Sequence, residues 1–126
     1  MTIQEKDADG TVVLVPDSNI TWRNQPELKR VLDHLADEGR TNVIIDLTHV
    51  EEISGYGLGL LASRCGRLRR NHGDIRLANP SKLIKRLLEV TNLDELFEQY
   101  PDTDRAVRSF TIVHRGSEGD GQEEED

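Results

Sequence analysis

Short apolar runs alternate with helical patterns along most of this chain, and no other feature limits the possible fold as strongly. The runs at 11–15, 42–47 and 74–78 are rich in branched aliphatic residues, as expected of buried strands. The run at 42–47 shows no alternation of polar and apolar residues, which is typical of a central parallel strand covered on both faces. Alternating strands and helices predict an α/β fold with a mostly parallel sheet and right-handed crossovers.

Several local signals place the helices between these runs. Asn24 is a favoured N-cap residue, and Pro26 has no amide to satisfy in a first helical turn. Apolar residues at 28, 31, 32, 35 and 36 then form one helical stripe, and Gly39 suits the position just after the helix. Three further helices are expected near Gly57, after Asn79–Pro80 with residues 83, 84, 87 and 88 facing inward, and from Asp102 or Thr103.

The two ends of the chain have different characters. An Asp9-Gly10 pair predicts a β-hairpin that joins residues 2–6 to the first apolar run, and residues 95–100 could form a short edge strand. The chain has 126 residues, which suits one domain, and we place it at 1–115. Residues 116–126 hold six acidic residues and no basic one, and without them the net charge changes from −8 to −2. We expect a disordered acidic tail there, which aids solubility or contacts a basic partner.

Composition excludes several classes of function. Aromatic residues make up 4% of the chain, too few for a surface that stacks nucleic-acid bases. No apolar stretch is long enough to span a bilayer, and the first residues contain no apolar segment typical of a secretory signal. Cys65 is the single cysteine, and the four histidines show no metal-ligand spacing. We therefore expect a cytoplasmic protein with no metal, cofactor, nucleic-acid partner or direct membrane insertion.

The stretch at 53–59 is the most unusual in the sequence, with glycine at 55, 57 and 59. Glycines permit positive φ angles and close approach of the backbone, and amides at the start of a helix stabilise anions such as phosphate. The same glycines could instead serve only tight packing of strand against helix. Their spacing does not match the dinucleotide fingerprint, and we identify no catalytic residue. The sequence therefore favours a binding protein over an enzyme or a nucleotide-binding protein.

The sequence resembles the STAS domain of anti-sigma factor antagonists over roughly residues 3–110. The segments that carry this resemblance are 43–50, 53–61, 73–80 and 88–97. In that family, the second serine of an Asp-Ser-Ser-Gly motif is phosphorylated by a partner anti-sigma kinase, and only the unmodified antagonist binds that kinase and releases a sigma factor. The resemblance implies an α/β STAS-like fold and a non-catalytic protein that binds an anti-sigma factor or a histidine-kinase-like ATPase.

The phosphorylated motif itself departs from the family pattern. If Gly57 is matched to the motif glycine, Tyr56 stands at the phosphoserine position, Gly55 at the first serine and Ser54 at the aspartate. The resemblance therefore implies a degenerate or lost serine switch. Ser54 could be phosphorylated only if the loop shifted by two residues, and a phenol oxygen at Tyr56 is poorly placed for a kinase shaped for serine. Tyr56 could instead be a rigid anchor for a partner.

The residues before the first helix extend the candidate binding surface. The carboxyl ends of parallel strands converge, so we expect Asp17, Asn19 and Trp22 to lie on the same face as Ser54 and Tyr56. Trp22 could alternatively cap the core. The candidate partner-binding residues are thus Ser54, Gly55, Tyr56, Gly57, Asp17, Asn19 and Trp22, with Ser54 and Tyr56 as possible phosphorylation positions. The alternative function is that of a STAS subunit in a lipid-transport ABC complex, where no serine switch is needed.

Three further groups have simpler interpretations. Asp46 is expected to be a hydrogen-bonding residue at a strand end and not an acid catalyst. Cys65 lies on an apolar helical stripe and is expected to be a small buried residue. The basic residues in the middle of the chain are expected to form either a solvated helix face or a docking surface for an acidic protein. They are Arg64, Arg67, Arg69, Arg70, Arg76, Lys82, Lys85 and Arg86.

Overall fold

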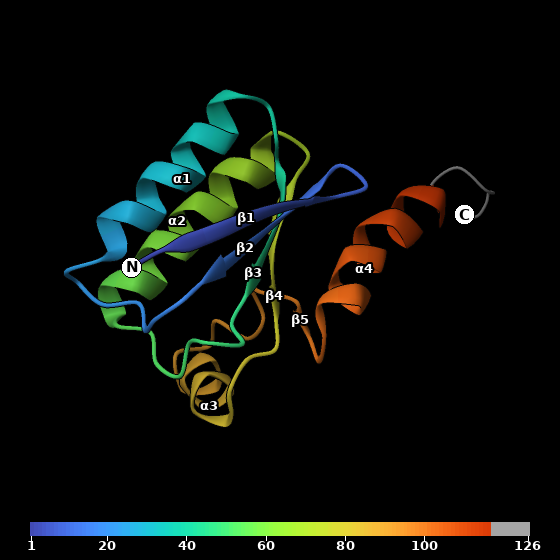
Figure 1. The fold of residues 1–126 in the computed structure, drawn as a ribbon. Coiled ribbons are helices and arrows are strands. Elements are labelled where there is room, and N and C mark those ends of the chain that lie inside the picture. The colour runs from blue at the N-terminus through green and yellow to red at the C-terminus, as the bar shows by residue number, and fades with distance from the viewer. Residues whose placement is uncertain (117–126) are drawn as a thin grey trace.

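A five-stranded sheet forms the centre of the computed structural model, which describes residues 1–116 with the side chains of the last helix up to Thr111 (Figure 1). The strands lie in the order β1-β2-β3-β4-β5, with β1 antiparallel to β2 and all other neighbours parallel. This confirms the predicted mostly parallel sheet with an N-terminal hairpin. The strands are β1 (Ile3–Ala8), β2 (Thr11–Pro16), β3 (Asn42–Asp46), β4 (Asp74–Ala78) and β5 (Gln99–Tyr100).

Four helices accompany this sheet within the described residues. They are α1 (Gln25–Asp37), α2 (Gly55–Arg70), α3 (Lys82–Val90) and α4 (Thr103–Gly116). The helices α1 and α2 cover one face of the sheet, α4 lies on the other side, and α3 lies beyond one end of the strands (Figure 1). The element order therefore follows the predicted alternation. Residues 117–126 of the predicted acidic tail lie outside the described residues.

The core has two parts, one on each face of the sheet. Val12 and Leu14 of β2 belong to the larger part beneath α1 and α2, whereas Val13 and Val15 pack toward Ala106 of α4. Successive residues of β2 thus point to opposite faces, and all six are buried. This explains why the central strands read as continuous apolar runs.

Two of the three predicted N-cap residues do not cap their helices. Asn24 precedes α1, but its side chain does not cap the helix. At α3 the cap is Ser81, whose hydroxyl accepts from the amide of Ile84 at 3.1 Å. Asn79, the predicted cap, has a φ of +57°. At α4, Asp102 caps as predicted and accepts from the amide of Arg105 at 2.7 Å.

Two other boundaries also differ from expectation. The second helix begins at Gly55, two residues before the predicted start at Gly57. The expected edge strand at 95–100 shrinks to its last two residues, because Phe97 is buried in the core with an exposed fraction of 1%. Gly39 follows α1 with a φ of +76°, which confirms its predicted role.

Candidate functional site

Three segments that leave the carboxyl ends of β2, β3 and β4 meet at one edge of the sheet, which we call the site edge. They are residues 17–24, residues 47–54 and residues 79–81. The first two segments run in parallel, with a bridge between Ile20 and Ile53. The amide of Ile20 donates to the carbonyl of Glu52 at 3.1 Å, and the amide of Ser54 donates to the carbonyl of Ile20 at 2.8 Å. The loop that carries Trp22 is thus joined directly to the start of α2.

Side-chain hydrogen bonds hold residues 47–54 from both sides. The carboxamide oxygen of Asn19 accepts from the amides of Glu51 and Glu52 at 2.8 and 3.2 Å. On the other side, the Ser81 hydroxyl donates to the carbonyl of Glu51 at 3.0 Å. Asn24 stabilises the first loop in turn, because its side chain accepts from the amide of Thr21 and donates to the carbonyl of Asn19. These bonds explain why Asn24 leaves α1 uncapped.

Close packing beneath the start of α2 requires glycine at one position. A Cβ atom on Gly57 would lie 2.7 Å from Cγ2 of Ile20 and 2.8 Å from Cγ2 of Ile53, far inside van der Waals contact. Only Gly10 and Gly39 have positive φ among the glycines of the described residues. The site glycines thus make no use of the positive φ that glycine permits, whereas Gly57 does use the close approach.

Ser54 begins α2 as its N-cap residue. Its backbone is extended, and its hydroxyl oxygen accepts from the amide of Gly57 at 3.1 Å. This bond satisfies one of the amides that the first turn of a helix leaves without a backbone partner. The predicted anion would therefore compete with the Ser54 hydroxyl for the Gly57 amide, and an anion site here stays a prediction.

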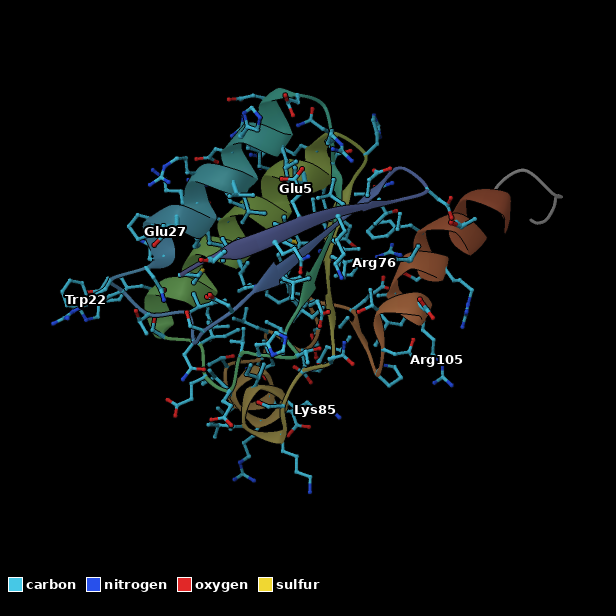
Figure 2. The ribbon with its side chains drawn as sticks, viewed as in Figure 1. Glu5, Trp22, Glu27, Arg76, Lys85 and Arg105 are labelled. Atoms are coloured by element: carbon cyan, nitrogen blue, oxygen red, sulfur yellow. The ribbon has the colours of Figure 1, made fainter. Side chains whose placement is uncertain are left out.

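Two large aromatic side chains on the site edge are directed toward solvent. Tyr56 has an exposed fraction of 71% and Trp22 one of 62%. Trp22 projects away from the sheet (Figure 2), and the guanidinium carbon of Arg23 lies 5.2 Å from the centre of its ring. The alternative that Trp22 caps the core is therefore wrong. Both rings extend from segments that the Ile20–Ile53 bridge joins.

Asp17 lies in the first segment of the site edge, but its hydrogen bond is made to the N-terminal residues. Its carboxylate accepts from the amide of Thr2 at 2.9 Å, and this bond lowers the pKa of Asp17 below its ordinary value. The contacts of Asp17 thus fasten the end of β2 to the N-terminal residues. Within the described residues, no hydrogen bond joins it to Ser54 or Tyr56.

Asp46 is held by neutral donors where β3 ends. Its Oδ1 accepts from the amide and the hydroxyl of Thr48 at 3.1 and 2.6 Å, and from Asn79 Nδ2 at 2.9 Å. Burial opposes ionisation, but these hydrogen bonds outweigh it and lower the pKa of Asp46. The side chain therefore serves to join β3 to the segment after β4, which confirms the predicted structural role.

The opposite edge, where β4 begins, brings charged side chains together around Asp74. Asp74 is 7% exposed, and its carboxylate accepts from Arg69 Nε at 2.8 Å and from Arg76 Nε at 3.0 Å. Arg76 also lies between the sheet and α4 (Figure 2), where its guanidinium carbon is 4.0 Å from the centre of the Phe110 ring. This edge is thus stabilised by buried charges.

Cys65 and the arginines of α2 take part in structural contacts. Cys65 is fully buried, and burial raises the pKa of its thiol to about 11, which confirms the predicted inert role. Arg64 and Arg67 both pair with Asp33 of α1, at 2.8 and 3.3 Å. The expected solvated face is therefore right in part: Arg69 and Arg70 are exposed, but ion pairs to neighbouring elements engage Arg64, Arg67 and Arg69.

The sequence did not reveal an apolar groove beside the site edge. Glu52 and Ile53 form one wall of it, and Leu83, Ile84 and Leu87 of α3 form the other, around a volume of about 230 Å³. Leu83, which was expected to face inward, is 55% exposed, whereas Ile84 is fully buried. The apolar pattern of α3 shows both residues but cannot tell which one faces the core.

The described residues contain no cluster of three or more His, Cys, Asp or Glu side chains that could hold a metal ion. Among their helices, none combines the length and apolar character that a membrane span requires.

Comparisons with known proteins agree with this architecture. Residues 2–106 match the STAS domain family. A Thermotoga maritima protein, named provisionally as an anti-sigma factor antagonist, is 26% identical over 103 residues, which cover 81% of this chain and 91% of that protein. The anti-sigma-B factor antagonist of Staphylococcus aureus is 31% identical over 71 residues, which cover 56% of this chain and 66% of that one.

The fold gives the same result as the sequence. The crystal structure of a Thermotoga maritima protein, described in the same provisional terms, superposes with a TM-score of 0.81 at 25% identity. The match covers 85% of this chain and 92% of the other. The chain therefore belongs to the STAS domain family, and its relatives include proteins named as anti-sigma factor antagonists.

Proposed function

We propose that this protein is a non-catalytic anti-sigma factor antagonist that acts in the cytoplasm and binds an anti-sigma factor through its site edge. The exposed pair of aromatic side chains, Trp22 and Tyr56, is the observation that carries the proposal. Aromatic residues of this kind dominate the binding energy of many protein interfaces. The names of the Staphylococcus aureus and Thermotoga maritima relatives support the choice of partner.

The hydrogen bonds of the site edge indicate that this protein presents an ordered surface to its partner. Asn19 and Ser81 fix the segment that leads into α2, and the Ile20–Ile53 bridge joins it to the Trp22 loop. A partner that binds here loses little free energy in ordering the backbone, because the backbone is already ordered. Burial of each aromatic side chain then contributes about 2 to 3 kcal/mol.

We also propose that the serine switch of the family is degenerate or lost in this chain. Tyr56 stands where the resemblance places the phosphorylated serine, and its ring is directed to solvent with an exposed fraction of 71%. Ser54 is the nearest hydroxyl of the serine type, but its oxygen already accepts from Gly57. Binding of the anti-sigma factor, including one of the histidine-kinase-like ATPase type, is then either constitutive or controlled by an input other than phosphorylation at position 56.

A binding assay with purified anti-sigma factors of the same organism tests the proposed partner. We expect a complex with one of them and release of its sigma factor. Trp22→Ala and Tyr56→Ala should each weaken the complex about tenfold or more. Arg30→Ala, which changes an exposed residue on the outer face of α1, is the control and should leave affinity unchanged. Absence of any complex would contradict the proposal, and binding to an ABC transporter instead would favour the alternative function.

Intact-mass measurement after incubation with the bound anti-sigma factor and ATP tests the state of the switch. No gain of mass is expected if the switch is lost. A gain that disappears in Ser54→Ala would place a working switch at the helix cap. A gain that disappears in Tyr56→Phe would place it on the exposed ring, and either gain would contradict a lost switch.

A further inference from the structure

Helix α3 presents an apolar stripe to solvent. Leu83, Leu87 and Val90 are spaced i, i+4 and i+7, which places them on one side of the helix. Leu83 is 55% exposed and Val90 is 64% exposed, whereas Ile84 and Leu88 are fully buried and attach the helix to the core. The stripe thus lies beside the buried face, with Leu87 partly buried against the core and with Leu83 and Val90 open to solvent.

Leu83 and Leu87 of the stripe line one wall of the groove described above, and hydrogen bonds hold the backbone opposite them. Ile53, on the facing wall, is only 4% exposed, because it packs inward beside Ile20. Ser81, at the start of α3, donates to the carbonyl of Glu51 and so holds the two walls together. The groove is therefore a lasting feature of the surface.

The charges around the groove are arranged asymmetrically. Lys82 and Arg86 are four residues apart and follow the apolar stripe along its solvent side, whereas Lys85 lies on the side of α3 away from the stripe. All three are exposed, and Lys85 is labelled in Figure 2. Within residues 1–116, no carboxylate lies at ion-pair distance from any of them. Glu52 stands on the facing wall.

We propose that this groove binds an amphipathic helix of the partner that carries acidic residues along one flank. Its apolar residues contact the stripe of α3, and its carboxylates pair with Lys82 and Arg86. A base on the other flank would face Glu52 and fix the direction of the helix. The inference rests on the proposed function in that the helix belongs to the anti-sigma factor, which would contact the aromatic pair and this groove together.

A protein helix fits these observations better than an anionic membrane surface does. A bilayer surface is flat, whereas the apolar residues here line a concave groove. The exposed carboxylates of Glu51 and Glu52 on the facing wall would repel anionic lipid headgroups. Opposite charges on the two walls instead suit a helix with two chemically different flanks.

Binding of two designed peptides tests the groove without knowledge of the partner. Each peptide is an amphipathic helix of about 18 residues, long enough to form a helix alone, with the same leucine stripe and with either glutamate or lysine beside it. Fluorescence anisotropy should show that the glutamate peptide binds about tenfold more tightly than the lysine peptide. Amide chemical shifts should change around Ile53, Leu83 and Leu87.

Charge reversal on α3 provides the matched variants. The double variant Lys82→Glu with Arg86→Glu should reverse the preference, so that the lysine peptide binds more tightly. Lys85→Glu reverses a charge on the same helix but away from the stripe, and it should keep the original preference. Leu83→Glu should remove binding of the glutamate peptide, and unchanged circular dichroism would show that the fold is intact.

Three results would overturn the inference. The first is that the two peptides bind equally well or that neither binds. The second is that Lys85→Glu changes the preference between the peptides as much as the double variant does. The third is that the protein sediments with phosphatidylglycerol vesicles but binds no peptide. The anti-sigma factor separates this inference from the proposed function. If that protein binds wild type and the double variant equally while Trp22→Ala weakens it, the proposed function stands and the groove is not part of the interface.

Discussion

The sheet carries one buried or half-buried carboxylate at each of two edges, and the two are held in different ways. Asp46, at the end of β3, accepts only from neutral donors on Thr48 and Asn79. Asp74, at the start of β4, accepts from two arginines. At the site edge, hydrogen bonds fix the backbone and leave the large side chains exposed. At the opposite edge, the charged side chains pair with one another within the protein.

This difference separates stability from recognition within a small domain. Changes at the opposite edge should reduce the free energy of unfolding with no specific effect on a partner. Changes at the site edge should affect binding more than stability. Four experiments, ordered from the largest expected effect on stability to the smallest, examine this division.

Gly73→Ala should be the most destabilising of the four. A Cβ atom at Gly73 would lie 2.0 Å from the carbonyl oxygen of Thr41, and that oxygen accepts from the amide of Asp74. Because the obstacle is backbone, the strand itself must move, and we expect a loss of about 3 kcal/mol or more in urea unfolding. Gly59→Ala is the control, since nothing lies within 4 Å of its Cβ position. If Gly73→Ala lost less free energy of unfolding than Gly59→Ala, the opposite edge would not be the part of the sheet that determines stability.

Asp74→Asn should follow, with a loss of about 2 to 3 kcal/mol in the free energy of unfolding. The change leaves Arg76, which is 8% exposed, without its main counter-charge. Asp33→Asn is the matched control, because it also removes ion pairs to two arginines but lies at a more exposed position. The control should lose less than about 1 kcal/mol. Similar losses in both variants would show that burial of the charges does not set their importance.

Asn19→Ala should cost about 1 kcal/mol of stability but have a clear effect on partner binding. The variant removes the side-chain acceptor for the amides of Glu51 and Glu52, so only the backbone bonds of Ile20 still hold the segment before α2 to the Trp22 loop. Calorimetry with the anti-sigma factor should show weaker binding with a larger entropic cost. Asn71→Ala removes an exposed asparagine at the other end of α2 and should leave binding unchanged. Unchanged binding in Asn19→Ala would indicate that backbone order at the site edge is irrelevant to recognition.

The smallest effect is expected from pH at the site edge. Because the folded pKa of Asp46 lies below its ordinary value of 3.8, its hydrogen bonds contribute stability above that pH. This contribution is lost as the pH falls through the folded value. The free energy of unfolding of wild type should therefore exceed that of Asp46→Asn by about 0.5 kcal/mol at pH 7, and the difference should shrink below pH 4. A difference that stays constant with pH would contradict this account. Asp94→Asn, at an exposed carboxyl that accepts no hydrogen bond within the described residues, is the control.

The sequence predicted the architecture well because the relevant signals are local. The apolar runs, the hairpin at Asp9–Gly10 and the cap at Asp102 all depend on residues near one another in the chain. The sequence failed where side chains have distant partners. Asn24 and Asn79 match the pattern of N-cap residues, but their side chains donate instead to the carbonyl of Asn19 and to the carboxylate of Asp46.

The candidate site was predicted in part for the same reason. Convergence of strand ends brought the Trp22 loop and the start of α2 together, as expected from a parallel sheet. The exposure of Trp22 could not be inferred, because a lone tryptophan in a loop is compatible with either side of the surface. The groove beside α3 was missed, since its two walls are about 30 residues apart in sequence and their contact runs through Ser81.

The position of Trp22 makes the site edge suited to direct optical measurement. It is the only tryptophan in the chain, and it stands in water within a domain whose other aromatic residues are two tyrosines and two phenylalanines. Indole emission moves to shorter wavelength when water leaves the ring. Binding of a partner at the site edge should therefore shift the Trp22 emission of the unlabelled protein to shorter wavelength. The shift can be followed in titrations and in stopped-flow experiments.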